Sequence, residues 1–144
     1  YPDAQAIIMH MQGEPQTMQN NPHYTHLIEE ITTFFDQRIA KATQKGVKNL
    51  ILDIGIGFGK TTEHNYALLA NLPTFHRFGL PLLVGASRKS LINAISPSDV
   101  EQRLGGTLAI HLHALSCGAN IIRCHDVFEH VQALQITQKI QNSY

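Results

Sequence analysis

Residues 49–60 read NLILDIGIGFGK. An apolar run ends around a single aspartate, Asp53, and three glycines within five residues then lead to Lys60. Consecutive apolar residues, in place of alternating ones, are typical of a strand buried on both faces of a parallel sheet. Glycines let a backbone approach a bound molecule closely. We therefore predict a buried strand at residues 49–54 and a ligand-binding loop directly after it.

The remaining chain predicts an alternation of strands and helices. Strands of the same buried kind are expected at three further apolar runs, residues 5–11, 80–85 and 120–124. The longest helical pattern is expected to begin at Asn21-Pro22, where a good N-cap precedes a proline, and to end at Gly46. Further helices are expected over residues 63–78, 96–117 and 126–140. Four strand-helix units predict an α/β fold with parallel, right-handed connections.

Composition narrows the class of protein. The 144 residues suit one domain, and 43% hydrophobic with 15% charged residues is typical of a folded globular chain. Net charge is zero, which argues against nucleic-acid and anionic-membrane partners. No apolar run approaches the ~18 residues of a membrane span. With no apolar leader and two isolated cysteines, Cys117 and Cys124, we expect a cytoplasmic protein.

The predicted strand-to-helix loops carry most of the chemistry. In β/α folds, ligands bind at the carboxyl ends of the strands. Four of the eleven Lys and Arg residues fall in these loops, namely Lys60, Arg88, Lys89 and Arg123. In a neutral protein, that concentration of cations predicts an anionic ligand.

Each loop also allows a plainer interpretation. Asp53 either caps the amides of its own loop or accepts hydrogen bonds from the paired N–H groups of a heterocycle. Residues 87–90, SRKS, open a helix and suit a phosphate or pyrophosphate, or else are solvated surface groups. Arg123 and His125 share a strand face, either as an anion site or as a satisfied hydrogen-bonded pair. A P-loop is disfavoured, because Ile54 stands where its first glycine belongs.

The spacing of the histidines outside these loops does not indicate a metal site. His111 and His113 are two residues apart on an expected helix, so they lie on different faces and cannot chelate together. Surface positions are expected for five more histidines, His23, His26, His64, His76 and His130. We therefore expect no metal ligand in this chain.

Taken together, the loops resemble the dihydropteroate synthase family of pterin-binding enzymes. The resemblance rests on four ordered motifs, residues 9–19, 52–60, 85–90 and 123–127. It implies the condensation of 6-hydroxymethyl-7,8-dihydropterin pyrophosphate with p-aminobenzoate in folate biosynthesis, by a sulfonamide-sensitive, usually dimeric (β/α)8 TIM barrel. Such a barrel needs about 250 residues. Residues 1–144 are therefore expected to be its C-terminal half, with the N-terminal half absent and the chain inactive alone.

The resemblance also implies roles for individual residues. Asp53 resembles the carboxylate that binds the pterin, Met9 packs beside that ring, and Lys89 bonds the ring and adjoins p-aminobenzoate. Gly57 and Phe58 resemble the wall of the p-aminobenzoate site. The expected catalytic residues are Lys89, Arg123 and His125, and the remaining substrate-binding residues are Gly85, Ser87 and Arg88. The Mg²⁺ that the family implies is expected to have its ligand in the missing half.

Two substitutions and two alternative functions accompany this interpretation. Ile54 stands where the family usually has proline, which removes a rigid backbone angle, and Cys124 replaces an aliphatic residue between Arg123 and His125. A pterin-dependent corrinoid methyltransferase is the alternative enzyme, although it does not require the two anion-binding motifs. A half-barrel module for binding or assembly, without catalysis, is the third hypothesis.

Overall fold

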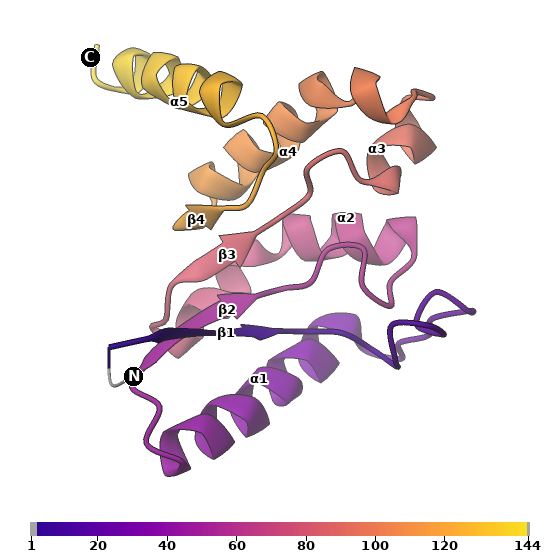
Figure 1. Cartoon of the computed structure of the whole chain (residues 1–144), viewed down its shortest axis with the longest axis vertical. Helices are drawn as coiled ribbons and strands as arrows, with labels where there is room; N and C mark the ends of the chain where they lie inside the picture. The colour runs from indigo at the N-terminus through magenta and orange to yellow at the C-terminus, as the bar shows by residue number, and fades with distance from the viewer. Residues whose placement is uncertain (1–2, 144) are drawn as a thin grey trace.

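The fold is built on one parallel sheet. A computed structural model describes residues 3–143. Its four strands are β1 (Gln5–Met9), β2 (Asn49–Asp53), β3 (Leu82–Val84) and β4 (Ile121–Ile122). The strands are parallel and lie side by side in chain order, as Figure 1 shows. Because right-handed connections that always advance in one direction place every helix on the same face, this order is that of a barrel segment.

The helices follow the strands as predicted, with two interruptions. They are α1 (Leu27–Gln44), α2 (Thr62–Ala70), the 3₁₀ helix η1 (Leu72–Phe78), α3 (Ser90–Ile95), the 3₁₀ helix η2 (Val100–Gln102), α4 (Leu104–Ser116) and α5 (Val127–Gln141). Pro73 lies in the first turn of η1, which Gly79 ends in a left-handed conformation. The expected helix over residues 96–117 is divided, because Asp99 and Gln102 form a capping box around η2 before α4 begins.

The predicted start of α1 is wrong. Asn21 has a positive φ of 54° in the preceding loop, so it does not cap the helix. The backbone N–H groups of Thr25 and His26 instead donate to the Glu30 carboxylate, each at 2.8 Å. A side chain from within the first turn therefore satisfies the helix start, and α1 begins at Leu27.

The two faces of the sheet differ in burial at the edge strand β1, whereas the central strands β2 and β3 are buried on both faces. Leu52, Leu82 and Val84 belong to the core between the sheet and the helices, together with Ile31 and Phe35 from the predicted apolar stripe of α1. On the other face, which the alternate residues of each strand share, Ile7 is 52% exposed. β1 and β4 each pair with one neighbour among the described strands. Within residues 3–143, no helix is both long and apolar enough to cross a bilayer.

Candidate active site

The site begins with two charged residues on the face of the sheet opposite the helices. Asp53 ends β2, and Arg123 follows β4 directly. Leu83 of β3 is in register with both Asp53 and Ile121, so the register places Arg123, two residues beyond Ile121, on the face that Asp53 shares. The Arg123 guanidinium donates to Asp53 Oδ2 at 2.9 Å. Residues 70 positions apart therefore form an ion pair because the carboxyl ends of parallel strands meet.

Asp53 makes one further contact inside its own loop. The backbone N–H of Gly55 donates to Oδ1 at 2.9 Å. Asp53 is only 1% exposed, whereas the Arg123 side chain is 49% exposed. The carboxylate thus caps its own loop and accepts a donor from across the sheet, and the arginine is the part that solvent reaches. Met9 lies directly opposite Asp53 in the register of β1 with β2.

A small hollow lies between the loops that follow β3 and β4. Its volume is about 160 Å³, and its lining residues are Gly85, Ser87, Lys89, Arg123, Cys124 and His125. Ser87 Oγ lies 2.8 Å from His125 Nδ1 and also accepts the backbone N–H of His125 at 3.2 Å. A Cβ at Gly85 would press on the Arg123 guanidinium, so the missing side chain makes room for that arginine. The hollow therefore gathers two cations, an imidazole and a hydroxyl.

Lys89 joins this hollow to the glycine-rich loop. Its ammonium donates to the carbonyl of Ile56 and lies 4.6 Å from the centre of the Phe58 ring. Gly57 leaves space for the stem of the lysine. Burial lowers the pKa of Lys89 from 10.5 to about 8, with Asp53 opposing the shift and Arg123 adding to it. Gly57, Phe58 and Lys89, which the resemblance grouped, thus lie together.

Lys60 does not face the hollow. It is 2% exposed, and its ammonium donates to the carbonyls of Gly55 at 2.8 Å, Phe58 at 2.9 Å and His10 at 3.4 Å. Burial lowers its pKa from 10.5 to about 7, with Asp53 opposing and Lys89 adding to that shift. Lys60 therefore holds the glycine-rich loop in shape, and its charge is not presented to a ligand.

Arg88 is also engaged within the protein. Its guanidinium forms two hydrogen bonds with the Asp126 carboxylate, at 2.7 and 3.2 Å, and lies 3.4 Å from Glu101. The backbone at Arg88 has a positive φ of 58°, and Thr107 and Arg103 hold its N–H and carbonyl. Arg88 does not line the hollow, and its contacts instead fix the turn that places Ser87 and Lys89.

One histidine expectation needs correction, and a second histidine, His10, on which no expectation was placed, is buried. His130 is not an isolated surface group, because its Nε2 lies 2.7 Å from Nδ1 of the fully buried His111. His10 is buried and packs edge-on against Phe34, and burial, with a contribution from Lys60, lowers its pKa to about 3. For His111, the one sequence signal was its place among the leucines of its helix. The pairing with a residue 19 positions away had no signal.

The donor set of the hollow does not fit Mg²⁺. Among the described residues, no group of three or more His, Cys, Asp or Glu side chains is arranged to hold a metal. Mg²⁺ prefers carboxylate and water oxygens, whereas Lys89 and Arg123 would repel it here and Asp53 is already paired with Arg123. No step is therefore assigned to a metal on these residues.

A parallel, singly wound sheet with a buried carboxylate and a cationic hollow at its carboxyl edge is the architecture of a barrel-type α/β protein. Residues 2–125 match the family described as pterin binding enzyme, and the chain belongs to that family. The resemblance drawn from its motifs is thereby confirmed.

The proteins most similar to this chain among those compared include several dihydropteroate synthases. The dihydropteroate synthase of Escherichia coli (strain K12) is 47% identical over 133 residues, which cover 91% of this chain and 47% of that protein. Yersinia pestis dihydropteroate synthase in a sulfonamide drug complex is 42% identical, with a TM-score of 0.93 over 97% of this chain and 52% of that one. The Thermus thermophilus enzyme in complex with 4-aminobenzoate is 38% identical, with a TM-score of 0.91 over 96% of this chain and 57% of that one. The chain spans about half the length of the relatives it matches, and the fold of its four β/α units is that of their barrels.

Proposed function

We propose that the protein containing this chain is a dihydropteroate synthase. It joins the amine of p-aminobenzoate to the methylene carbon of 6-hydroxymethyl-7,8-dihydropterin pyrophosphate. The new C–N bond replaces the C–O bond to pyrophosphate, which leaves with its electron pair, and the amine loses a proton. The observation that carries this proposal is the convergence of Asp53, Lys89 and Arg123, from three different strand ends, around one cationic hollow.

The pterin end of the substrate suits Asp53. A pterin presents an amino group and a ring N–H side by side, and a carboxylate accepts two such donors. The Arg123 guanidinium, itself a planar set of N–H donors, occupies one oxygen of that carboxylate. We infer that the pterin edge takes this place and that Arg123, which is half-exposed, turns towards the hollow. Met9 is placed to pack beside the ring.

The pyrophosphate end suits the hollow itself. Lys89 and Arg123 supply positive charge, and charge-assisted hydrogen bonds to phosphate oxygens are strong. When the Ser87 hydroxyl donates to His125 Nδ1, the neutral ring carries its proton on Nε2, where it serves as one more donor. These groups stabilise the negative charge that develops on the leaving pyrophosphate in the transition state, and such stabilisation lowers the barrier.

The aromatic substrate suits the space beside Phe58. Gly57 leaves the space that the stem of Lys89 fills, and the Lys89 ammonium lies over the face of the Phe58 ring. With its pKa lowered to about 8, Lys89 remains largely protonated at neutral pH. It is therefore placed to orient both substrates, one through its charge and one through the loop carbonyl that it holds.

We also propose that residues 1–144 form the C-terminal half of a complete (β/α)8 barrel. Among the described strands, β1 and β4 each have one edge without a neighbour, and this and the half-length match to the relatives both support the assignment. The Mg²⁺ that the family implies then takes its ligands from outside residues 3–143. We expect the complete enzyme to be a homodimer in the cytoplasm, where Cys117 and Cys124 remain as the free thiols seen here.

Calorimetric titration of the full-length protein tests the assignment of the two ends. Arg123→Ala should weaken binding of the pyrophosphorylated pterin at least tenfold. Binding of 6-hydroxymethylpterin should not weaken, because the variant removes the guanidinium that occupies the Asp53 oxygen. Arg77→Ala is the matched control, since Arg77 is exposed in η1, before the amino end of β3. Equal losses for both ligands in a folded Arg123→Ala protein would contradict the proposal.

A further inference from the structure

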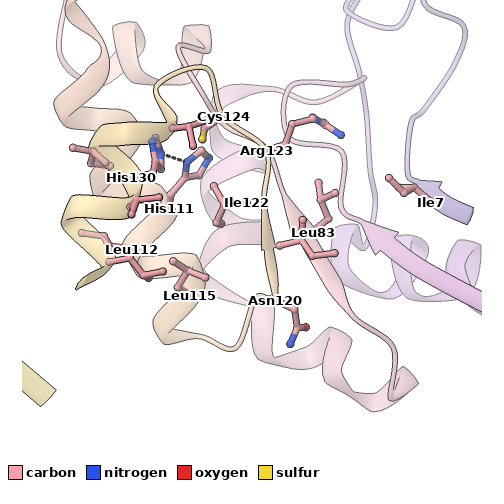
Figure 2. Close-up of a pocket in the computed structure, with 15 residues that line it drawn as sticks. Ile7, Leu83, His111, Leu112, Leu115, Asn120, Ile122, Arg123, Cys124 and His130 are labelled. Atoms are coloured by element: carbon pink, nitrogen blue, oxygen red, sulfur yellow. Dashed lines mark hydrogen bonds between the residues drawn. The ribbon is translucent and has the colours of Figure 1, made fainter. Parts of the chain in front are cut away.

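A chain of hydrogen bonds runs through two histidines beneath the hollow. The backbone N–H of Ala86 donates to His111 Nε2 at 2.9 Å. His111 Nδ1 lies 2.7 Å from His130 Nε2, and His130 Nδ1 lies 2.6 Å from the backbone carbonyl of Asp126. Figure 2 shows the two rings facing each other across their shared bond, one from α4 and one from α5.

The backbone groups at the two ends of this hydrogen-bonded series determine which nitrogen of each imidazole ring carries the proton. A backbone N–H can only donate, so Nε2 of His111 is the bare nitrogen and a neutral ring carries its proton on Nδ1. That proton is donated to His130 Nε2, which leaves the proton of His130 on Nδ1, and a carbonyl can only accept it. Every ring nitrogen therefore has one partner and one role.

This series of hydrogen bonds connects the two loops that line the hollow. Ala86 directly precedes Ser87, and Asp126 directly follows His125. Ser87 and His125 are themselves hydrogen-bonded at 2.8 Å. The histidine pair therefore fixes the backbone on both sides of the Ser87–His125 contact, from below the hollow, without touching a ligand there.

The surroundings keep His111 neutral. His111 is fully buried, and the charged or titratable groups around the pair are Lys89 from the loop after β3, and Arg123, Cys124 and Asp126 from the connection between β4 and α5. Burial, then His130 and Lys89, lower the pKa of His111 from 6.5 to about 4. A proton on Nε2 would remove the acceptor for the Ala86 N–H, so the neutral state is the one that holds the loop.

We propose that His111 and His130 are positioning residues that hold Ser87 and His125 in the geometry needed to bind the pyrophosphate group. This inference rests on the proposed function, because it takes the hollow to be the anion site. The pair acts through the backbone of Ala86 and Asp126, so it sets the affinity for the anion and leaves the pterin contact at Asp53 unchanged.

Substitutions at His111 separate positioning from mere packing. In the full-length protein, His111→Leu should weaken binding of inorganic pyrophosphate about tenfold, measured by calorimetry. His111→Gln should restore binding to within about threefold, because the amide oxygen can accept the Ala86 N–H. 6-Hydroxymethylpterin should bind all these proteins equally. His113→Leu is the matched control, since His113 lies on the same helix but contacts the Leu69 carbonyl.

NMR of ¹⁵N-labelled histidine tests the geometry without any substitution. The unmodified protein should show His111 with a bare Nε2 and a protonated Nδ1, and the opposite tautomer or a charged ring at neutral pH would overturn the proposal. Should His111→Leu not fold, His130→Leu removes the next partner and should also weaken pyrophosphate binding.

The outcomes distinguish this inference from the proposed function. If Arg123→Ala loses pyrophosphate binding while a folded His111→Leu keeps it, the positioning role is wrong and the proposed function stands. If Arg123→Ala also keeps full pyrophosphate affinity, the hollow is not the anion site, and both proposals fail.

Discussion

Replacing Asp53 by asparagine should remove most of the affinity for the pterin. The amide keeps one oxygen, which can still accept the Gly55 N–H, but it places an NH₂ group where Oδ2 now accepts from Arg123. In the complex, that NH₂ would face the donors of the pterin edge. A lost charge-assisted hydrogen bond, with two buried donors left facing each other, costs about 2 kcal/mol or more, which is about a 30-fold rise in Kd.

The same substitution should affect folding much less. The partner of Asp53 in the free protein is the half-exposed Arg123, and solvent screening limits such an ion pair to about 1 kcal/mol. Asp53→Asn should therefore fold, with a small loss in unfolding free energy and a large loss in binding. Calorimetric titration of the full-length protein with 6-hydroxymethylpterin measures the second quantity.

The control for this prediction is Asp36→Asn, which makes the same chemical change at an exposed position on α1. It should leave affinity and stability unchanged. A folded Asp53→Asn protein that binds the pterin as tightly as the unmodified one would refute the role given to the carboxylate.

Three further predictions concern stability, measured by urea unfolding of the full-length protein. Gly55→Ala should cost about 2 kcal/mol more than Gly46→Ala, because both glycines have positive φ but only at Gly55 would a Cβ overlap a backbone carbonyl; equal costs would contradict this. Lys60→Met should cost about 2–3 kcal/mol by leaving buried carbonyls without a donor, whereas the exposed Lys48→Met should cost almost nothing. The free energy of unfolding should fall as pH drops from 6.5 towards 4, because His111 binds a proton in the unfolded chain but stays neutral in the fold. His111 contributes about 3 kcal/mol to this loss, and an unchanged pH dependence in His111→Gln would contradict the prediction.

Periodicity and glycine placement predicted the order of strands and helices but not all of their limits. β4 is limited to Ile121–Ile122, although the apolar run extends over residues 120–124, and only single backbone bonds to β3 flank it, from the N–H groups of Asn120 and Arg123. The start of α1 was missed because an acceptor within the first turn, Glu30, replaced the expected cap at Asn21. Local signals find an element, while tertiary contacts decide where it ends.

The site was predictable where a topological rule applied. The rule that strand ends gather in parallel folds predicts from the sequence alone that Asp53, Lys89 and Arg123 lie together. The same rule could not tell that Lys60 turns inward to carbonyls or that Arg88 pairs with Asp126, because both depend on how the loops pack. It also gave no sign of the His111–His130 pair, which joins two different helices.

The condensation itself is the most direct test of the proposed site. Full-length protein should be mixed with 6-hydroxymethyl-7,8-dihydropterin pyrophosphate and p-aminobenzoate, and the products followed by mass spectrometry together with a pyrophosphate assay. We predict dihydropteroate and pyrophosphate in equal amounts, only when both substrates are present, with Arg123→Ala strongly impaired and Arg77→Ala unaffected. A folded full-length protein that binds both substrates but forms no dihydropteroate would contradict the assignment.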